Sequence, residues 1–174
     1  MDGMRIEWAS RTRAAVCRVT PVILIFLMVL LGLMPIGLPY VDPVTPALGI
    51  ISVYYWSIHR PEYCPAAGVF IIGLLQDALS GTPMGMSSLV FLGVYGVGVS
   101  QRRVLIGKSV LVEWLGFLIL GSVAITSQWA ISALFFEFFI DPRPALTQCL
   151  FSAALYPCVA WVFGRAQRSL METV

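Results

Sequence analysis

Long apolar runs, separated by short polar or proline-containing breaks, dominate this chain of 174 residues. The sequence has six such runs, at about residues 22–39, 44–58, 63–79, 84–100, 115–136 and 144–163. A helix needs about 20 mostly apolar residues to cross the hydrocarbon core of a bilayer. The pattern therefore predicts an all-α integral membrane protein with six transmembrane helices, in a single membrane domain that comprises residues 1–174.

The composition excludes other classes of protein. Hydrophobic residues make up 59% of the chain and charged residues 11%, against roughly 25% charged in a soluble domain. Disorder requires few apolar residues and a high charge, and a soluble globule needs more polar groups than these to cover its surface. The small net charge of +2 gives no reason to expect nucleic acid as a partner, whereas the lipid bilayer is an expected one.

The stretch 104–140 allows two arrangements. As one helix it would be roughly 55 Å long, far beyond a hydrocarbon core of about 30 Å. Either it forms two short spans, or it starts at the membrane interface near Lys108 and Glu113 and continues as one tilted span from about Leu115 to Phe136.

The basic residues favour the second arrangement. With six spans and a cytoplasmic N-terminus, ten of the eleven Lys and Arg residues fall on the inner side, and Arg143 falls outside. Positive charge gathers on the cytoplasmic side of membrane proteins, so we expect a multi-pass protein with both termini in the cytoplasm. The same layout places Trp56, Trp114 and Trp161 near inner ends, where indole rings suit the interface.

Groups for catalysis, cofactors or metals are scarce. The single histidine, His59, lies in a short inner loop and has no neighbouring nucleophile with which to form a triad, and Glu113 is interpreted as an interfacial acid paired with a nearby base. The four cysteines lack metal-ligand spacing and read as free thiols, at Cys17, Cys64, Cys149 and Cys158. Gly93, Gly96 and Gly98 lie inside an apolar span, where we expect them to serve close helix packing, and Gly96 and Ser100 form a small-xxx-small pair. No cofactor and no enzymatic activity are predicted.

Asp77 is the acid that most needs explanation, because a charge within a span is costly unless it faces protein or water. Gly73, Gln76, Asp77 and Ser80 share one helical face at spacings i, i+3, i+4 and i+7, near the predicted outer end of the third span. Bulky residues occupy the opposite face, which we expect to meet lipid: Phe70, Ile71, Leu74, Leu75 and Leu79. The polar face either docks a partner helix or lines a cavity, or it is a clamp that holds the bundle together.

The run Gly73-Leu-Leu-Gln-Asp77-Ala-Leu-Ser-Gly-Thr-Pro-Met-Gly85 resembles the signature of the rod shape-determining protein MreD family. In that family a helix that ends in Gly-Leu-x-x-Asp leads into a turn containing Gly and Pro, and a Gly opens the next helix. The resemblance covers roughly forty residues closely, and elsewhere only length, hydropathy and topology agree. It adds the turn to the predicted partner-binding residues, which are Gly73, Gln76, Asp77, Ser80, Gly81, Pro83 and Gly85.

The resemblance implies a non-enzymatic inner-membrane component of the bacterial cell-elongation complex. Such a protein binds MreC and helps to couple MreB filaments to the peptidoglycan synthases. The family is also considered similar in fold to the substrate-binding subunits of vitamin transporters, so a small-molecule-binding transporter subunit is the alternative. An intramembrane enzyme is the weakest hypothesis, since paired catalytic groups are missing.

Overall fold

The computed structural model describes residues 20–34, 46–105, 107, 109–136 and 141–172. All regular elements in these ranges are helical, which confirms the predicted all-α class. The elements, in chain order, are a first helix Thr20–Leu33, α2 Leu48–His59, the 3-10 helix η1 Pro61–Tyr63, α3 Ala66–Ser80, α4 Met86–Leu105, α5 Val110–Phe136 and α6 Arg143–Glu172. The basic residues before Thr20, together with Cys17 and Lys108, lie outside the described ranges.

The six longer helices differ in length. Two segments, Val110–Phe135 and Arg143–Arg168, are long and apolar enough to cross a membrane, whereas the first helix and α3 are shorter apolar helices. In the described part of the stretch 104–140, α4 ends at Leu105 and one further helix follows, α5, whose 27 residues rise about 40 Å. This continuous helix begins five residues before the predicted start of the span at Leu115.

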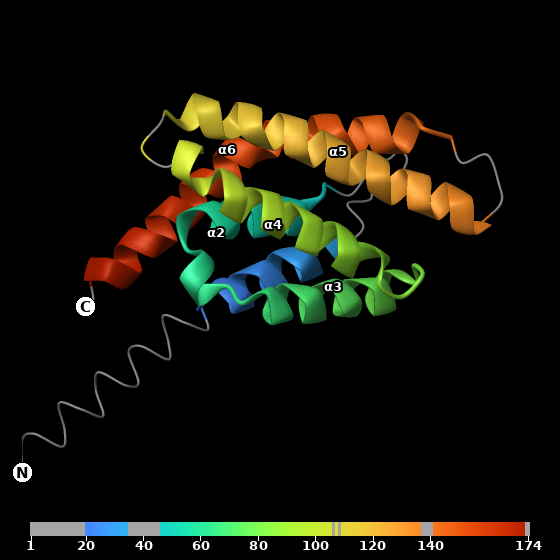
Figure 1. Ribbon diagram of the computed structural model, residues 1–174, viewed down its shortest axis with the longest axis horizontal. Coiled ribbons are helices and arrows are strands. Elements are labelled where there is room, and N and C mark those ends of the chain that lie inside the picture. The colour runs from blue at the N-terminus through green and yellow to red at the C-terminus, as the bar shows by residue number, and fades with distance from the viewer. Residues whose placement is uncertain (1–19, 35–45, 106, 108, 137–140, 173–174) are drawn as a thin grey trace, which may run out of the picture.

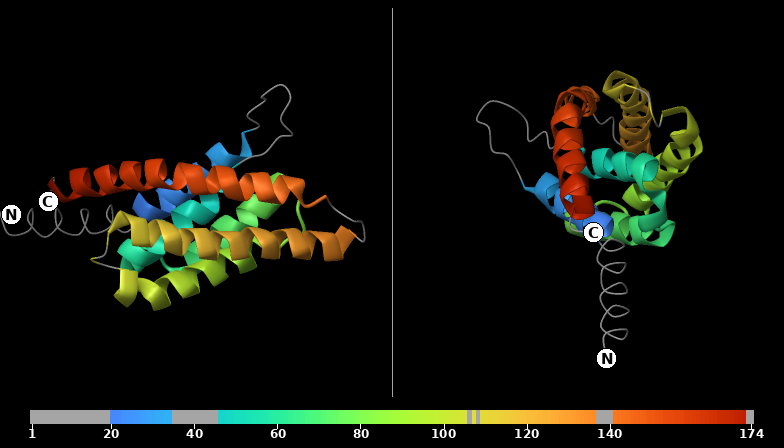
Figure 2. Two further views of the ribbon diagram at one scale, coloured as in Figure 1. Left: turned by 90° about the horizontal axis from the view of Figure 1, so that it is seen from above. Right: turned by 90° about the vertical axis from the view of Figure 1, so that its left-hand side faces the viewer.

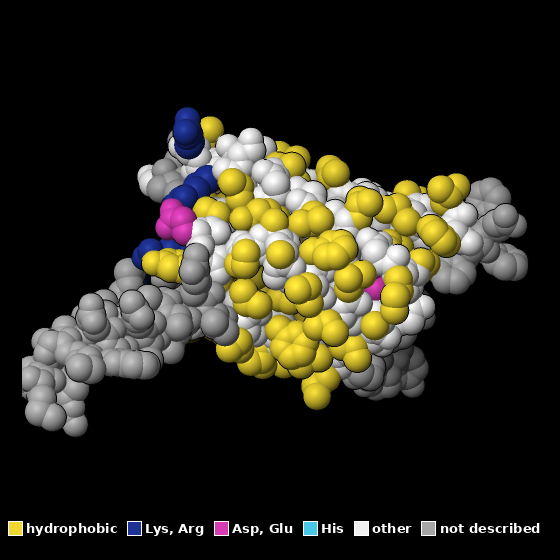
Figure 3. Space-filling model, turned by 60° about the horizontal axis from the view of Figure 1, so that its bottom comes forward, with side chains coloured by type: hydrophobic (Ala, Val, Ile, Leu, Met, Phe, Trp, Pro, Cys, Tyr) yellow, Lys and Arg dark blue, Asp and Glu magenta, His cyan; other side chains and the backbone are white. Residues whose placement is uncertain are grey.

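The helices form an elongated bundle, with successive helices running in opposite directions (Figure 1). The first helix begins and α6 ends at the same end of the bundle. Lys and Arg side chains gather at this end (Figure 3), where α2 and α4 also end, and we call it the basic end. At the opposite end α3 turns into α4, and we call that the hairpin end.

Helix α2 is the centre of the bundle (Figure 2). All residues from Leu48 to Ile58 are buried, and α2 packs on α4, α5 and α6. A helix that is apolar on every side is stable only when it is surrounded. Trp56 belongs to this core with 2% of its surface exposed, so its predicted place at the membrane interface is wrong. The interfacial prediction fits Trp161 better, since it is 67% exposed beside Arg165.

Glycines allow α2 to approach two neighbours closely. A methyl group on Gly98 of α4 would overlap Ser57 of α2, and one on Gly116 of α5 would lie 2.5 Å from the Tyr54 hydroxyl. We predicted close packing for the glycines of this segment, which Gly98 confirms, but a methyl group on Gly93 or Gly96 would meet no described atom within 4 Å. The close contact within the chain therefore lies two residues further along α4, and Gly96 faces outward.

The proline within α6 has a partner in α5. Pro157 lacks an N–H, so the carbonyl of Ala153, four residues earlier, loses its helical hydrogen bond. The indole N–H of Trp114 in α5 donates to this carbonyl at 2.9 Å. A helix interrupted by proline is tolerated in a membrane where a neighbour satisfies the freed backbone group, and this bond ties α5 to α6.

We expect Trp114→Phe to lower the free energy of unfolding by about 1–3 kcal/mol, because the Ala153 carbonyl would be left without a donor. The measurement is reversible unfolding of the purified protein in detergent. Pro157→Ala is the matched background, since it restores the N–H that bonds Ala153 within α6. The two substitutions should therefore cost less together than the sum of their separate effects, and strict additivity would contradict this assignment.

Candidate functional site

The site begins where α3 ends. Gly81 adopts the left-handed conformation with φ 68°, and its N–H bonds the carbonyl of Asp77. The N–H of Thr82 bonds the same carbonyl at 3.2 Å. Glycine reaches positive φ without the steric cost that other residues bear, and it commonly ends helices in this way. The predicted turn thus starts from a helix end that the sequence specifies.

The side chain of Asp77 accepts hydrogen bonds from the residues on the far side of the turn. Its Oδ1 accepts hydrogen bonds from the Thr82 hydroxyl at 3.0 Å and the Ser87 N–H at 3.0 Å, and its Oδ2 accepts one from the Gly85 N–H at 2.9 Å. The N–H groups belong to the start of α4, where backbone donors lack helical partners. A carboxylate at a helix N-terminus is stabilised by these donors and by the helix dipole. Asp77 therefore caps α4 from the neighbouring helix, and it is fully buried.

Gly73 brings the two helices of the hairpin together. A methyl group on Gly73 would lie 2.5 Å from the Cα of Ser88 and 2.7 Å from its backbone nitrogen. The Ser88 hydroxyl also donates to the carbonyl of Phe70 in α3 at 3.1 Å. Because backbone meets backbone here, only a residue without a side chain fits between the helices.

The predicted stripe on α3 is oriented as expected. Gly73 and Asp77 are buried against α4, while the opposite face is open, with Ile71 56% and Leu79 57% exposed. The other predicted partner residues are partly or fully exposed at the hairpin end: Gln76, Ser80, Gly81, Pro83 and Gly85. The structure supports the clamp interpretation for Asp77 itself, and partner binding by the seven residues stays a prediction.

A cavity of about 470 Å³ adjoins this turn. Gln76, Ser80 and Thr82 form its α3 side. The remaining walls come from the first helix, the start of α2, the first residue of α4, the second half of α5 and the start of α6. Stable ligand sites occupy cavities of this order, with few polar groups on mostly apolar walls. The predicted polar face of α3 thus lies partly on a cavity.

Sequence reasoning missed the polar residues that α5 and α6 add to the cavity: Gln128, Ser132 and Gln148. Gln128 and Ser132 are spaced i, i+4 on α5, so they share one face. The same test that singled out Gln76 and Ser80 on α3 would have found them. Asp77 drew attention because it is charged, whereas uncharged amides cost less in a span.

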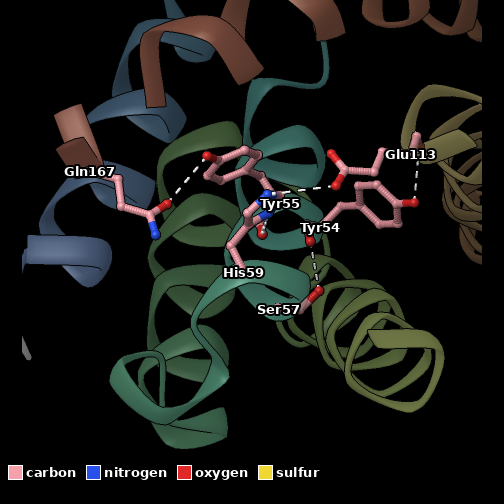
Figure 4. A network of polar contacts seen from close by, with 6 residues as sticks. All are labelled: Tyr54, Tyr55, Ser57, His59, Glu113 and Gln167. Carbon is pink, nitrogen blue, oxygen red and sulfur yellow. Dashed lines mark hydrogen bonds and ion pairs between the residues drawn. The ribbon is translucent and has the colours of Figure 1, made fainter. Parts of the chain in front are cut away.

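A second polar cluster lies at the basic end (Figure 4). His59 stacks on Tyr55 with ring centroids 4.1 Å apart, and its Nδ1–H donates to the Tyr55 carbonyl at 3.1 Å. Its Nε2 lies 3.7 Å from Oε1 of Glu113, so Glu113 is near a base, as predicted. The Tyr54 hydroxyl donates to the Glu113 carbonyl at 3.1 Å.

This cluster lacks the arrangement of a catalytic triad. The hydroxyl of Ser57 donates to the Tyr54 carbonyl at 2.7 Å, so it is not presented to His59 as a nucleophile would be. The contacts join the end of α2 to α5, and the Tyr55 hydroxyl adds a bond to Gln167 of α6 at 3.4 Å. We interpret the cluster as a structural tie between three helices. In the described ranges, His, Cys, Asp and Glu residues form no group of three that suits a metal ion.

We expect Gly73→Ala to destabilise the protein by about 1–3 kcal/mol, which is the cost of overpacking a tight contact. The matched control is Gly93→Ala on α4, where a methyl group would meet nothing within 4 Å. Alanine at that position should be neutral or stabilising by up to about 1 kcal/mol, because it favours helix more than glycine does. Thermal unfolding in detergent measures both, and equal effects would contradict the close backbone approach.

Comparison with known proteins gives a family match over most of the chain. A family model described as rod shape-determining protein MreD matches residues 12–165. An uncharacterized protein of Rickettsia prowazekii (strain Madrid E) is 28% identical over 96 residues, which are 55% of this chain and 54% of that protein. The chain thus matches about half the length of this relative. No solved structure matches the chain. Because the family model covers most of the sequence, including both helices of the hairpin and its turn, the chain belongs to the MreD family of rod shape-determining membrane proteins.

Proposed function

We propose that this protein is a non-enzymatic, multi-pass component of the bacterial inner membrane that binds MreC and helps to couple MreB filaments to peptidoglycan synthesis. Membership of the MreD family implies a role in rod shape determination, and this is the observation that carries the proposal. The finer statement needs a surface on which a membrane partner can dock, and an orientation that presents it.

The orientation proposed has six spans and both termini in the cytoplasm. It is supported by the charge distribution, since Arg60, Arg102, Arg103, Arg165 and Arg168 belong to the ends of α2, α4 and α6 at the basic end. Arg143 begins α6 at the hairpin end, beside Asp141. Under the positive-inside rule the basic end faces the cytoplasm, and the hairpin end with its cavity faces the periplasm.

The face of α4 that carries Gly93, Gly96 and Ser100 suits the docking of a single transmembrane helix. All three residues are exposed, and a methyl group on either glycine would meet no described atom within 4 Å. Small residues at this spacing let a second helix approach closely in lipid, where packing and polar contacts drive association. Asp77 fixes the position of this face, because its carboxylate accepts a hydrogen bond from the first turn of α4.

The depletion of this protein in a rod-shaped host tests the role in cell shape. We expect cells to lose their cylindrical form as the protein is depleted, because the coupling between filaments and wall synthesis would fail. Light microscopy with cell-width measurement is the readout, and expression of the wild-type chain from a second locus is the control. Cells that stay cylindrical at full depletion would contradict the proposal.

Association with MreC is tested with Gly96→Leu and Asp77→Ala. We expect Gly96→Leu to reduce co-purified MreC several-fold while leaving insertion and stability intact, since the leucine points away from the bundle. Asp77→Ala should also weaken association, because α4 loses its cap, and the apolar helices should still insert.

Two substitutions serve as controls for this experiment. Val123→Leu changes an exposed position of α5 (59% exposed), and Asp141→Ala removes an acid that is 59% exposed at the hairpin end. Both should retain wild-type yields of MreC. Wild-type yields in Gly96→Leu and Asp77→Ala as well would exclude this face and the hairpin as the contact.

A second candidate function is that of a small-molecule-binding subunit of a transporter. The cavity at the hairpin end is the observation that favours it, because its volume of about 470 Å³ falls within the range of ligand sites. The two candidates predict different losses. Removal of the scaffold changes cell shape, whereas removal of the binding subunit abolishes uptake of a solute.

A further inference from the structure

The walls of the cavity combine apolar and hydrogen-bonding groups. Val29, Leu33 and Ile125 contribute apolar surface, and the polar residues converge from three helices: Gln76, Ser80, Thr82, Gln128, Ser132 and Gln148. Amide side chains offer both donors and acceptors, and hydroxyl groups do the same. A ligand whose own groups both donate and accept would match such walls best.

Part of this polar surface has no partner within the described part of the chain. The Gln76 amide makes no hydrogen bond or ion pair there, although it reaches toward Gly49 of α2. The indole N–H of Trp129, another wall residue, is buried without an acceptor among the described residues. A buried donor without a partner costs about 1–3 kcal/mol. An acceptor on a bound molecule would remove that cost.

The described residues around the cavity offer no counter-charge to an ion. The described lining contains no Lys, Arg, Asp or Glu. The carboxylate of Asp77, which follows the lining residue Gln76 on α3, is occupied by Thr82, Gly85 and Ser87. Burying a charged ligand without a partner of opposite charge is strongly unfavourable, so the walls select against phosphates, carboxylates and amines.

We propose that the cavity at the hairpin end binds an uncharged, hydroxyl-rich group of about the size of a sugar ring. This inference names the ligand class for the second candidate function and rests on it. The volume would otherwise hold roughly 15 waters at about 30 Å³ each, which leaves room for such a ring with its hydroxyls on the glutamines. The group has two possible sources, the headgroup of a neutral glycolipid or a free polyhydroxyl solute.

Two probes separate these sources, both tested on the full chain in phosphatidylcholine nanodiscs. Monoglucosyl diacylglycerol is the lipid probe, and native mass spectrometry measures its retention against diacylglycerol and phosphatidylglycerol with the same acyl chains. Radiolabelled methyl β-glucoside is the soluble probe, measured by equilibrium dialysis. Binding of the glucolipid alone identifies a headgroup site, and binding of the glucoside identifies a solute site.

Gln76→Leu is the principal variant, because its amide makes no bond to the described residues that the substitution would break. Gln128→Leu is the second, although it also removes a bond from the Gln128 amide to the Ser87 hydroxyl. Gln101→Leu is the matched control, since Gln101 is exposed on α4 near the basic end. We expect at least tenfold weaker probe binding in the first two and wild-type binding in the control.

Three results would overturn the proposal. The first is that neither glucosyl probe binds the wild type above the diacylglycerol or buffer baseline. The second is that all variants bind the probes equally. The third is that phosphatidylglycerol binds as tightly as the glucolipid and that Gln76→Leu weakens this binding too. If Gln128→Leu fails to fold, Gln76→Leu alone decides. Cell shape and MreC yield do not depend on these probes, so a failure here leaves the scaffold proposal standing and a failure there leaves this site standing.

Discussion

The hydrogen bonds to the Asp77 carboxylate are the interaction on which the described architecture depends most. A buried carboxylate costs several kcal/mol unless donors surround it. Here Thr82, Gly85 and Ser87 supply them from the turn and from the start of α4. The turn supplies the donors that the buried carboxylate requires, and the carboxylate accepts bonds from backbone N–H groups that lack helical partners. The hairpin therefore has one favourable geometry. That geometry sets the register of α4, the helix against which both α2 and α3 pack.

The buried central helix explains how so short a segment is stable in an apolar protein. Helix α2 has 12 residues and rises about 18 Å, which is well short of a hydrocarbon core of about 30 Å. Because α4, α5 and α6 surround it, it need not meet lipid along that length. Its aromatic residues then serve packing, as the stacking of Tyr156 on Phe117 beside Tyr54 illustrates. An apolar run has the same sequence pattern whether lipid or protein covers the helix.

This ambiguity marks the limit of what the sequence could predict. Apolar patterning correctly predicted the all-α class, because it depends on local spacing. For the same reason the structure has a helix within each apolar run, and Gly73 and Asp77 lie on the buried face of α3. Which helix occupies the centre depends on contacts between distant residues. Spacing alone therefore did not show that Trp56 is buried inside the bundle, or that Gly98 is the one among Gly93, Gly96 and Gly98 that makes the close contact. Local spacing shows that Gln128 and Ser132 share one face of α5, but only the fold brings that face to Gln148 of α6 and to the polar residues of α3.

The hairpin and the cavity share residues, and this links the two proposed roles physically. Thr82 donates to Asp77 and also lines the cavity, and Gln76 and Ser80 flank Asp77 on the same helix. A molecule that draws on the hydroxyl of Thr82 would compete with the cap of α4. A partner that packs on α4 would in turn bias the same turn. Two ligands that change the free energy of the same turn are coupled, and the coupling is reciprocal. Occupancy of the cavity and docking on α4 would then strengthen or weaken each other through a single carboxylate.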